Sequence, residues 1–158
     1  MNIFPTKILL ATDGSEDAEL ALRAAVDIAE KTGSELHVVH AWHSIPSTRF
    51  EAYIRAQLKK EAQELLDDQV RKIKATGGSV VQAHLRIGRA DEEIVALAEE
   101  IGADLIVMGS RGLGGIRRAL MGSISGSVAR HAHCPVLVVR KEATVTGQVG
   151  ERERRLER

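Results

Sequence analysis

The sequence predicts a doubly wound α/β domain, an open five-stranded parallel sheet with helices on both faces. Short, dense apolar runs rich in β-branched residues alternate along the chain with longer amphipathic stretches, so strands and helices take turns. Three of the runs show almost no polar alternation, which is typical of strands covered on both sheet faces. Strands joined through helices pair in parallel by right-handed crossovers, and we expect the strand order 3-2-1-4-5, numbered along the chain.

Five apolar runs define the strands of this sheet. The predicted strands are Lys7–Ala11, Glu35–Ala41, Ser79–Ile87, Ala103–Met108 and Pro135–Val139. The first, fourth and fifth lack polar alternation, so we expect helices to cover both of their faces.

Four helical stretches separate the strands. They are Ser15–Thr32, Arg49–Thr76, Ala90–Ile101 and Ser123–Ala132. Ser15 suits the N-cap of the first, and acidic residues follow it at the positive end of the helix dipole. The second helix carries one apolar stripe, made of Ile54, Leu58, Ala62, Leu65, Val70 and Ile73.

Composition restricts the classes of protein that the chain can belong to. Its 158 residues, 44% hydrophobic and 28% charged, suit one soluble globular domain. Lysine plus arginine and aspartate plus glutamate both number 22, so the net charge is zero and gives no general attraction to nucleic acid or to an anionic membrane. We therefore expect neither as a partner, and any bound anion needs a local site.

The termini and the cysteine count favour a cytoplasmic protein. The first residues lack a basic start followed by a long apolar stretch, so we expect no signal peptide. The single cysteine, Cys134, rules out an intrachain disulfide and fits a reducing compartment. We assign 1–142 to one domain and 143–158 to a charged tail, either mobile or folded as a short terminal helix.

Two loops of this fold are expected to carry a ligand. In open α/β sheets, ligands lie at the carboxyl ends of the strands, where the strand order reverses. This rule points to the loops after the first and fourth strands. Both are unusual in sequence, the first reading Ala11-Thr-Asp-Gly-Ser15 and the second running from Gly109 to Gly122 with many glycines.

The second loop has the chemistry of a phosphate cradle. Gly109-Ser-Arg-Gly112 follows a buried strand directly, and Gly122-Ser123 opens the fourth helix. Glycines let backbone N–H groups approach a phosphate, and the helix start adds unpaired donors and a positive dipole end. The hydroxyls of Ser123 and Ser125 and the charge of Arg111 add to this set. The alternative is a flexible surface turn without a ligand.

Two well-known phosphate motifs are excluded. A P-loop requires a Gly-Lys pair, and the sequence contains none. The dinucleotide fingerprint requires three glycines in the first strand-to-helix turn, whereas Gly112-Leu-Gly114 follows the fourth strand and is continued by Arg117 in place of the third glycine.

The pattern does resemble that of a known family. Gly109, two residues, Gly112, nine residues and then Gly122-Ser123 is similar to the mark of the ATP-binding branch of the universal stress protein family. The resemblance runs from about Lys7 to Arg140 and includes ILLATDGSEDAELAL, LHVVHAW and HCPVLVVR. It implies bound ATP, a regulatory role in stress, and a homodimer formed through the last strand, Val136–Val139.

The resemblance also implies roles for single residues. Asp13 would lie beside the ribose and phosphates, through a divalent cation such as Mg²⁺. Ala11 and Thr12 would flank the adenine, and Ala41 would contact it through the backbone. Met108 would line the base or ribose pocket. The phosphates would be held by Gly109, Gly112, Gly122 and Ser123, with Ile124 and Ser125 nearby. Ala11 departs from the family, which often has proline there.

Other readings of these residues stay open. Asp13 could simply cap the turn before the first helix. His131, His133 and Cys134 resemble a metal cluster, but they straddle a helix-to-strand junction and we favour structural roles for them.

Three functions are compatible with the sequence. The first is an ATP-binding regulatory module, and the second is an enzyme that hydrolyses ATP slowly or phosphorylates itself. The third is a nucleotide-free dimer scaffold, which the complete set of glycines argues against. The sequence does not separate ATP from AMP or a cyclic nucleotide, because the adenine contacts would be made largely by the backbone.

Overall fold

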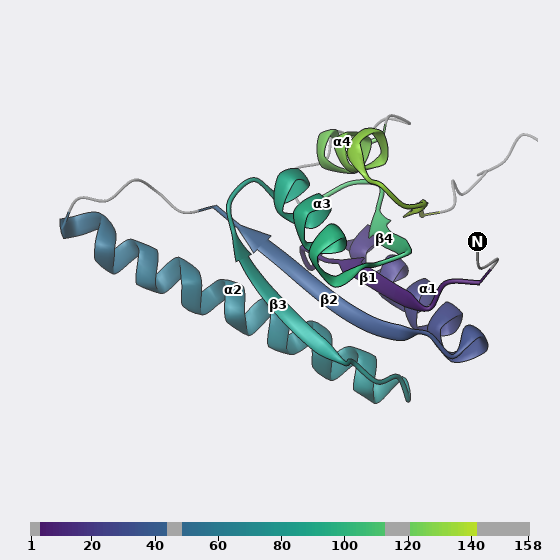
Figure 1. Cartoon of the computed structure of the whole chain (residues 1–158). Helices are drawn as coiled ribbons and strands as arrows, with labels where there is room; N and C mark the ends of the chain where they lie inside the picture. Colours follow the sequence, from purple (N-terminus) through teal and green to yellow (C-terminus); the bar gives the residue numbers. More distant parts are fainter. Residues whose placement is uncertain (1–3, 44–48, 113–120, 142–158) are drawn as a thin grey trace, which may run out of the picture.

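Five strands and four helices alternate along the chain in the computed structural model, which describes residues 4–43, 49–112 and 121–141 (Figure 1). The strands are β1 Lys7–Ala11, β2 Glu35–Trp42, β3 Gln82–Ile87, β4 Leu105–Gly109 and β5 Val136–Val139. The helices are α1 Glu16–Thr32, α2 Arg49–Ala75, α3 Ala90–Ile101 and α4 Ser123–His131. The predicted tail, 143–158, and the arginines 117 and 118 lie outside the described residues.

The strands form one parallel sheet in the order β3-β2-β1-β4-β5, which confirms the predicted topology. β1 lies at the centre, with Ile8 opposite Leu36 of β2 and Leu105 of β4. The strand order reverses between β1 and β4, so the carboxyl ends of these two strands flank the switch point.

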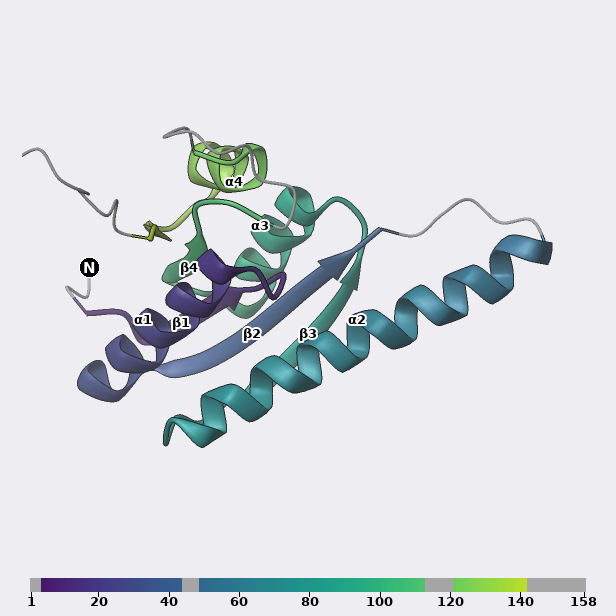
Figure 2. The ribbon, with the colours of Figure 1, turned by 180° about the vertical axis from the view of Figure 1, so that it is seen from behind.

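Two apolar layers hold the helices to the sheet, one on each face. Alternate residues of β1 serve the two layers, because successive side chains of a strand point to opposite faces. Ile8 and Leu10 pack in the layer shared with α1 and α2, whereas Leu9 and Ala11 pack in the layer shared with α3 and α4. Figure 2 turns the molecule by 180°, so that the face covered by α1 and α2 is toward the reader.

The helix ends follow the signals in the sequence. Ser15 is the N-cap of α1, and its side chain accepts a hydrogen bond from the Ala18 amide at 3.3 Å. Gly33 ends the helix in the left-handed conformation, at a φ of 68°. The firm cap fixes where α1 begins, directly after the loop that follows β1.

The fifth strand corrects one expectation. We expected helices to cover both of its faces, but Leu137 of this edge strand is 37% exposed. A run of apolar residues is therefore left partly open at this edge in the single chain.

The apolar stripe of α2 also differs from its prediction. The buried residues are Ala62, Leu66, Gln69 and Ile73, so Leu66 and a glutamine replace Leu65 and Val70 at its centre. All four lie in the carboxyl-terminal half of the helix. In Figures 1 and 2 the other half extends past the carboxyl ends of β2 and β3, and no residue from 51 to 61 is buried.

At the amino-terminal end of the strands, the Asp104 carboxylate joins the start of β1 to the start of β4. It accepts hydrogen bonds from the amides of Thr6 and Lys7 at 2.9–3.0 Å and from the Thr6 hydroxyl at 2.8 Å. Partial burial raises the pKa of Asp104, but these hydrogen bonds more than offset burial and hold the pKa below its ordinary value.

We expect Asp104→Asn to lower the free energy of unfolding by about 1 kcal/mol at pH 7, because the hydrogen bonds to a charged acceptor are weakened. The folded-state pKa lies below the unfolded one, so the stabilisation is present above about pH 4 and is lost as the pH falls through the lowered pKa. Urea unfolding at several pH values should show the wild type and the variant converging in acid. Asp27→Asn, which removes only an exposed ion pair with Lys31, is the control and should stay within about 0.5 kcal/mol.

Candidate functional site

The turn after β1 is shaped by local hydrogen bonds. The Thr12 amide donates to the Val39 carbonyl at 3.0 Å, which extends the ladder between β1 and β2 by one residue. Asp13 Oδ1 accepts from the Ser15 amide at 2.9 Å, and Gly14 between them has a φ of +75°. Only glycine adopts that conformation without strain, so the sequence Thr-Asp-Gly-Ser sets the turn.

Ser110, after β4, joins three elements around the switch point. Its amide donates to Val139 of β5 at 2.9 Å, and its hydroxyl donates to Asp17 Oδ2 in the first turn of α1 at 2.7 Å. Its carbonyl accepts from the Gly122 amide at 2.7 Å and from the Ser125 hydroxyl at 2.8 Å. Ser110 is only 2% exposed, so these bonds form in a dry environment where they are strong.

A second bond joins the two loops. The Ser15 hydroxyl donates to the Arg111 carbonyl at 3.2 Å. The start of α1 is thereby held against the glycine turn, and the predicted neighbourhood of the two loops is observed.

The glycines of the loop after β4 are sites of close approach. A Cβ at Gly109 would lie 2.7 Å from the carbonyl carbon of Asp17, and one at Gly122 would lie 2.7 Å from the Ser110 carbonyl oxygen. A Cβ at Gly112 would lie 2.5 Å from Asp13 Oδ2. The first two spaces are filled by backbone, whereas the third faces the Asp13 carboxylate.

A cavity of about 560 Å³ opens between these loops, which is a typical size for a small-molecule site. All twelve residues that the sequence singled out lie on its wall: Ala11, Thr12, Asp13, Ala41, Met108, Gly109, Arg111, Gly112, Gly122, Ser123, Ile124 and Ser125. The wall also contains residues that sequence reasoning missed, namely Ser15, Ala18, Val39, His40, Ala90, Ile94, Ser110 and Met121.

The wall combines an apolar and a polar part. Ala11, Val39 and Met108 belong to the apolar layer beneath α3 and α4, and Ile94 of α3 completes it. The polar part consists of the glycine turn, the Asp13 carboxylate and the start of α4. The first amides of a helix have no acceptor within it, and Gly122, the N-cap of α4, makes no side-chain cap bond. This arrangement suits a ligand with one flat apolar end and one anionic end.

Two residues of the wall, Ser125 and His40, hold the loops in place through hydrogen bonds. The Ser125 hydroxyl donates to the carbonyls of Ser110 and Gly122, so it fixes the start of α4. His40 Nδ1 lies 2.8 Å from the Thr12 carbonyl, and because a carbonyl only accepts, this nitrogen carries the hydrogen. His40 therefore fixes the turn after β1, and a lone histidine on a strand gave no signal of that.

The His131 ring and the Cys134 thiol near β5 have local surroundings that differ from those of a metal site or a reactive thiol. Among the described residues, no three histidine, cysteine or acidic side chains are grouped to hold a metal ion. His131 Nδ1 bonds to the Ser127 carbonyl of its own helix at 2.8 Å. Burial, with a further contribution from Asp104, raises the pKa of the Cys134 thiol, which disfavours a reactive thiolate. In the described part of the chain, no helix has the length and apolarity needed to cross a bilayer.

A doubly wound sheet with a glycine-lined cavity at its switch point defines a class of small α/β binding proteins. The model of the universal stress protein family matches residues 5–140, and the chain belongs to this family. It is 36% identical over 140 residues to a universal stress protein of Methanocaldococcus jannaschii, covering 85% of this chain and 82% of the relative.

Solved structures agree with this assignment. A hypothetical protein whose biochemical function was assigned from its structure has a TM-score of 0.78 at 31% identity, covering 88% of this chain and 98% of the other. A universal stress protein in complex with cAMP has a TM-score of 0.70 at 27% identity, covering 87% of this chain and 99% of the other.

We expect Gly109→Ala to lower the free energy of unfolding by about 1–3 kcal/mol, because its methyl group must displace the backbone of α1. Gly126→Ala is the matched control, since its Cβ would meet its nearest neighbour at 3.6 Å within α4, where alanine raises helix propensity by up to about 1 kcal/mol. Chemical denaturation measures both. Equal effects of the two substitutions would contradict the close packing of β4 against α1.

Proposed function

We propose that the chain is a cytoplasmic ATP-binding regulatory protein of the stress response, in the ATP-binding branch of its family. One observation carries the proposal: the glycine turn, the start of α4 and the Asp13 carboxylate face one cavity whose other end is apolar. Backbone amides at a glycine turn and a helix N-terminus are a general means of binding phosphate. The bound cAMP of the similar universal stress protein supports an adenine nucleotide as the ligand.

The apolar end of the cavity suits the adenine ring. Ala11, Ala41 and Met108 stand at the carboxyl ends of β1, β2 and β4, and Ile94 of α3 lies beyond them. Small and apolar side chains leave a flat space there, and the strand ends supply backbone groups for the ring nitrogens. In this proposal the ribose passes Asp13, and the phosphates reach the turn at Gly109–Gly112 and the helix start at Gly122–Ser123.

A divalent cation fits the proposed site. A carboxylate beside a triphosphate is unfavourable unless a cation lies between them. Mg²⁺ commonly takes one or two protein carboxylates and completes its shell with phosphate oxygens and water. Asp13 would be its protein ligand. Arg111, on the same wall, would add positive charge for the phosphates.

Nucleotide binding in this proposal regulates rather than drives chemistry. The phosphates would contact the start of α4, and α4 leads directly into β5. β5 is a partly open apolar edge, which suits pairing with a second copy in a homodimer through Val136–Val139. Occupancy of the cavity would thus act on the elements nearest the dimer edge.

Nucleotide analysis tests the proposed ligand. We expect the purified protein to release an adenine nucleotide on denaturation, and the emptied protein to bind ATP in calorimetry more tightly with Mg²⁺ than without it. Gly122→Val should weaken binding at least tenfold, because the side chain would collide with the Ser110 carbonyl and distort the cradle.

Parallel titrations with AMP and cyclic AMP show which nucleotide the site prefers. Gly126→Ala, in the same helix, is the control and should bind as the wild type does. A protein that binds none of these nucleotides, or a Gly122→Val variant of unchanged affinity, would refute the assignment of the cradle.

Sedimentation equilibrium tests the dimer. Leu137→Glu places a charge on the open edge, and a two-fold interface would bring two such charges together, so we expect the variant to be monomeric at concentrations where the wild type dimerises. Val81→Glu, at a position 58% exposed beside the opposite edge, is the matched control. A dimer that resists Leu137→Glu but dissociates with Val81→Glu would place the interface on the β3 side.

A further inference from the structure

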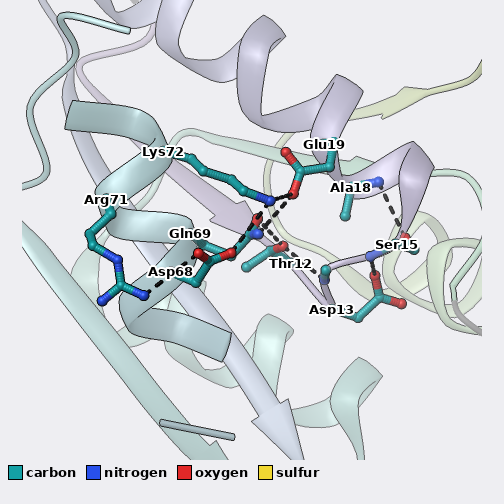
Figure 3. A network of polar contacts seen from close by, with 10 residues as sticks. Thr12, Asp13, Ser15, Ala18, Glu19, Asp68, Gln69, Arg71 and Lys72 are labelled. Carbon is teal, nitrogen blue, oxygen red and sulfur yellow. Dashed lines mark hydrogen bonds and ion pairs between the residues drawn. The ribbon is translucent and has the colours of Figure 1, made fainter. Parts of the chain in front are cut away.

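The second helix is bonded to the turn after β1 although none of its described residues lies on the cavity wall. Gln69 of α2 is 1% exposed. Its side chain contacts Thr12, which directly follows β1 and is 6% exposed. The Thr12 hydroxyl and Gln69 Oε1 are 2.8 Å apart, and Gln69 Nε2 lies 2.9 Å from Glu19 Oε1 in α1 (Figure 3). A buried glutamine therefore uses both ends of its amide between the turn and a carboxylate.

The charge of Glu19 fixes the direction of the hydrogen bonds in the series Thr12–Gln69–Glu19. Burial raises the pKa of Glu19, but the hydrogen bonds from Gln69 and Lys72 outweigh burial and lower it, so the group is a carboxylate at neutral pH. A carboxylate only accepts, so the amide nitrogen of Gln69 faces Glu19 and its oxygen faces Thr12. Thr12 must then donate its hydroxyl hydrogen to Gln69.

The series of hydrogen bonds extends by one bond at each end. The Gly14 amide donates to the Thr12 hydroxyl oxygen at 3.3 Å, and Lys72 Nζ donates to Glu19 Oε1 at 2.7 Å. Each donor on the path from Gly14 through Thr12 and Gln69 thus points toward the Glu19 charge. Such a chain strengthens its members because each bond polarises the next.

The turn is consequently held from two sides. The position that a Cβ at Gly14 would take lies 3.3 Å from Leu65 Cδ1, so α2 also packs against the turn at that residue. On the cavity side, Asp13 Oδ2 faces Gly112. Thr12 and Gly14 are fixed by α2, and Asp13, between them, projects toward the proposed phosphate site. The contacts of α2 with the turn thus lie on both sides of Asp13 in the sequence.

We propose that Gln69 is a positioning residue of the nucleotide site and that it couples α2 to the occupancy of the cavity. The inference rests on the proposed function and adds to it a route by which the bound nucleotide affects α2. The amino-terminal half of α2 extends beyond the sheet, so an effect of the bound nucleotide on α2 would reach the surface of the molecule there.

A glutamine that served only the core would behave differently. Its loss would lower the free energy of unfolding and leave the affinity of the folded protein for ATP unchanged. A positioning residue changes the affinity of the folded protein, and its effect depends on the partner through which it acts, here Thr12.

The experiment compares variants of α2 by calorimetry with ATP and Mg²⁺. Gln69→Met keeps the length of the side chain and removes both hydrogen bonds, and we expect the Kd to rise about tenfold, the factor that corresponds to one buried hydrogen bond. Gln63→Met is the matched control, because the exposed Gln63 amide donates to Asp67 of the same helix, at 2.8 Å. Its Kd should equal that of the wild type.

Two further measurements separate coupling from stability. In a double-mutant cycle, Thr12→Val should add little to the effect of Gln69→Met on the Kd, because both remove the same bond. If Gln69→Met does not fold, the comparison of Thr12→Val with Thr12→Ser tests the same bond, because only valine removes the hydroxyl that donates to Gln69; we expect the Kd to rise more with valine than with serine. Saturating ATP should slow amide hydrogen exchange around residues 65–73 of α2 in the wild type and not in Gln69→Met.

The outcomes distinguish this inference from the proposed function. A wild type that binds ATP, with Gln69→Met binding equally well and the α2 exchange unaffected by ATP, would overturn the coupling and leave the proposed function standing. A wild type that binds no adenine nucleotide would overturn both. Additive effects of Thr12→Val and Gln69→Met would show that the two residues act separately and would also overturn it.

Discussion

The hydrogen bonds of Ser110 hold the elements around the switch point in their arrangement. Its amide, carbonyl and hydroxyl bond to β5, to α4 and to α1, in a place that solvent does not reach. Because the carbonyl oxygen takes two donors from the start of α4, the helix must begin where it does. Gly109 and Gly122 have no side chains to hold these elements apart. Their positions in the sequence therefore mark where two stretches of backbone come into contact.

The described residues around the cavity are bonded to one another and to the surrounding elements. The turn after β1 is bonded within itself, to His40 on one side and to Gln69 on the other, while the loop after β4 is bonded to α1. A ligand that meets fixed donors loses less free energy to ordering the protein than one that must assemble its site. Most of the buried polar side chains therefore lie at or beside the cavity, and the two layers between helices and sheet are apolar.

The sequence predicted the sheet and its strand order, because apolar runs, glycine spacing and helix caps mark alternating strands and helices. Most of the residues on the cavity wall came instead from the resemblance to the family. The sequence did not predict Ser110, His40 or Gln69. A serine in a glycine-rich turn looks like any loop residue, and its partners are distant along the chain. Gln69 stands within the apolar stripe of α2, and pattern reasoning placed Leu65 and Val70 there instead. The bond from Gln69 to Thr12 spans 57 positions of the sequence, so no local pattern indicated it. The partial exposure of β5 was missed for another reason, since an apolar run looks the same whether a helix or a second chain covers it.

The overhang of α2 gives the fold a part that can vary independently. Its carboxyl-terminal half carries all of the fully buried residues of the helix, so the core constrains that half alone. A stretch of about a dozen residues without such support is marginal as a helix in water, and its persistence comes from the anchored half that it continues. Each turn gained or lost at the free end changes the reach of the helix by about 5.4 Å and disturbs neither the sheet nor the cavity. The length of this end can therefore differ between related proteins while the cavity keeps its shape.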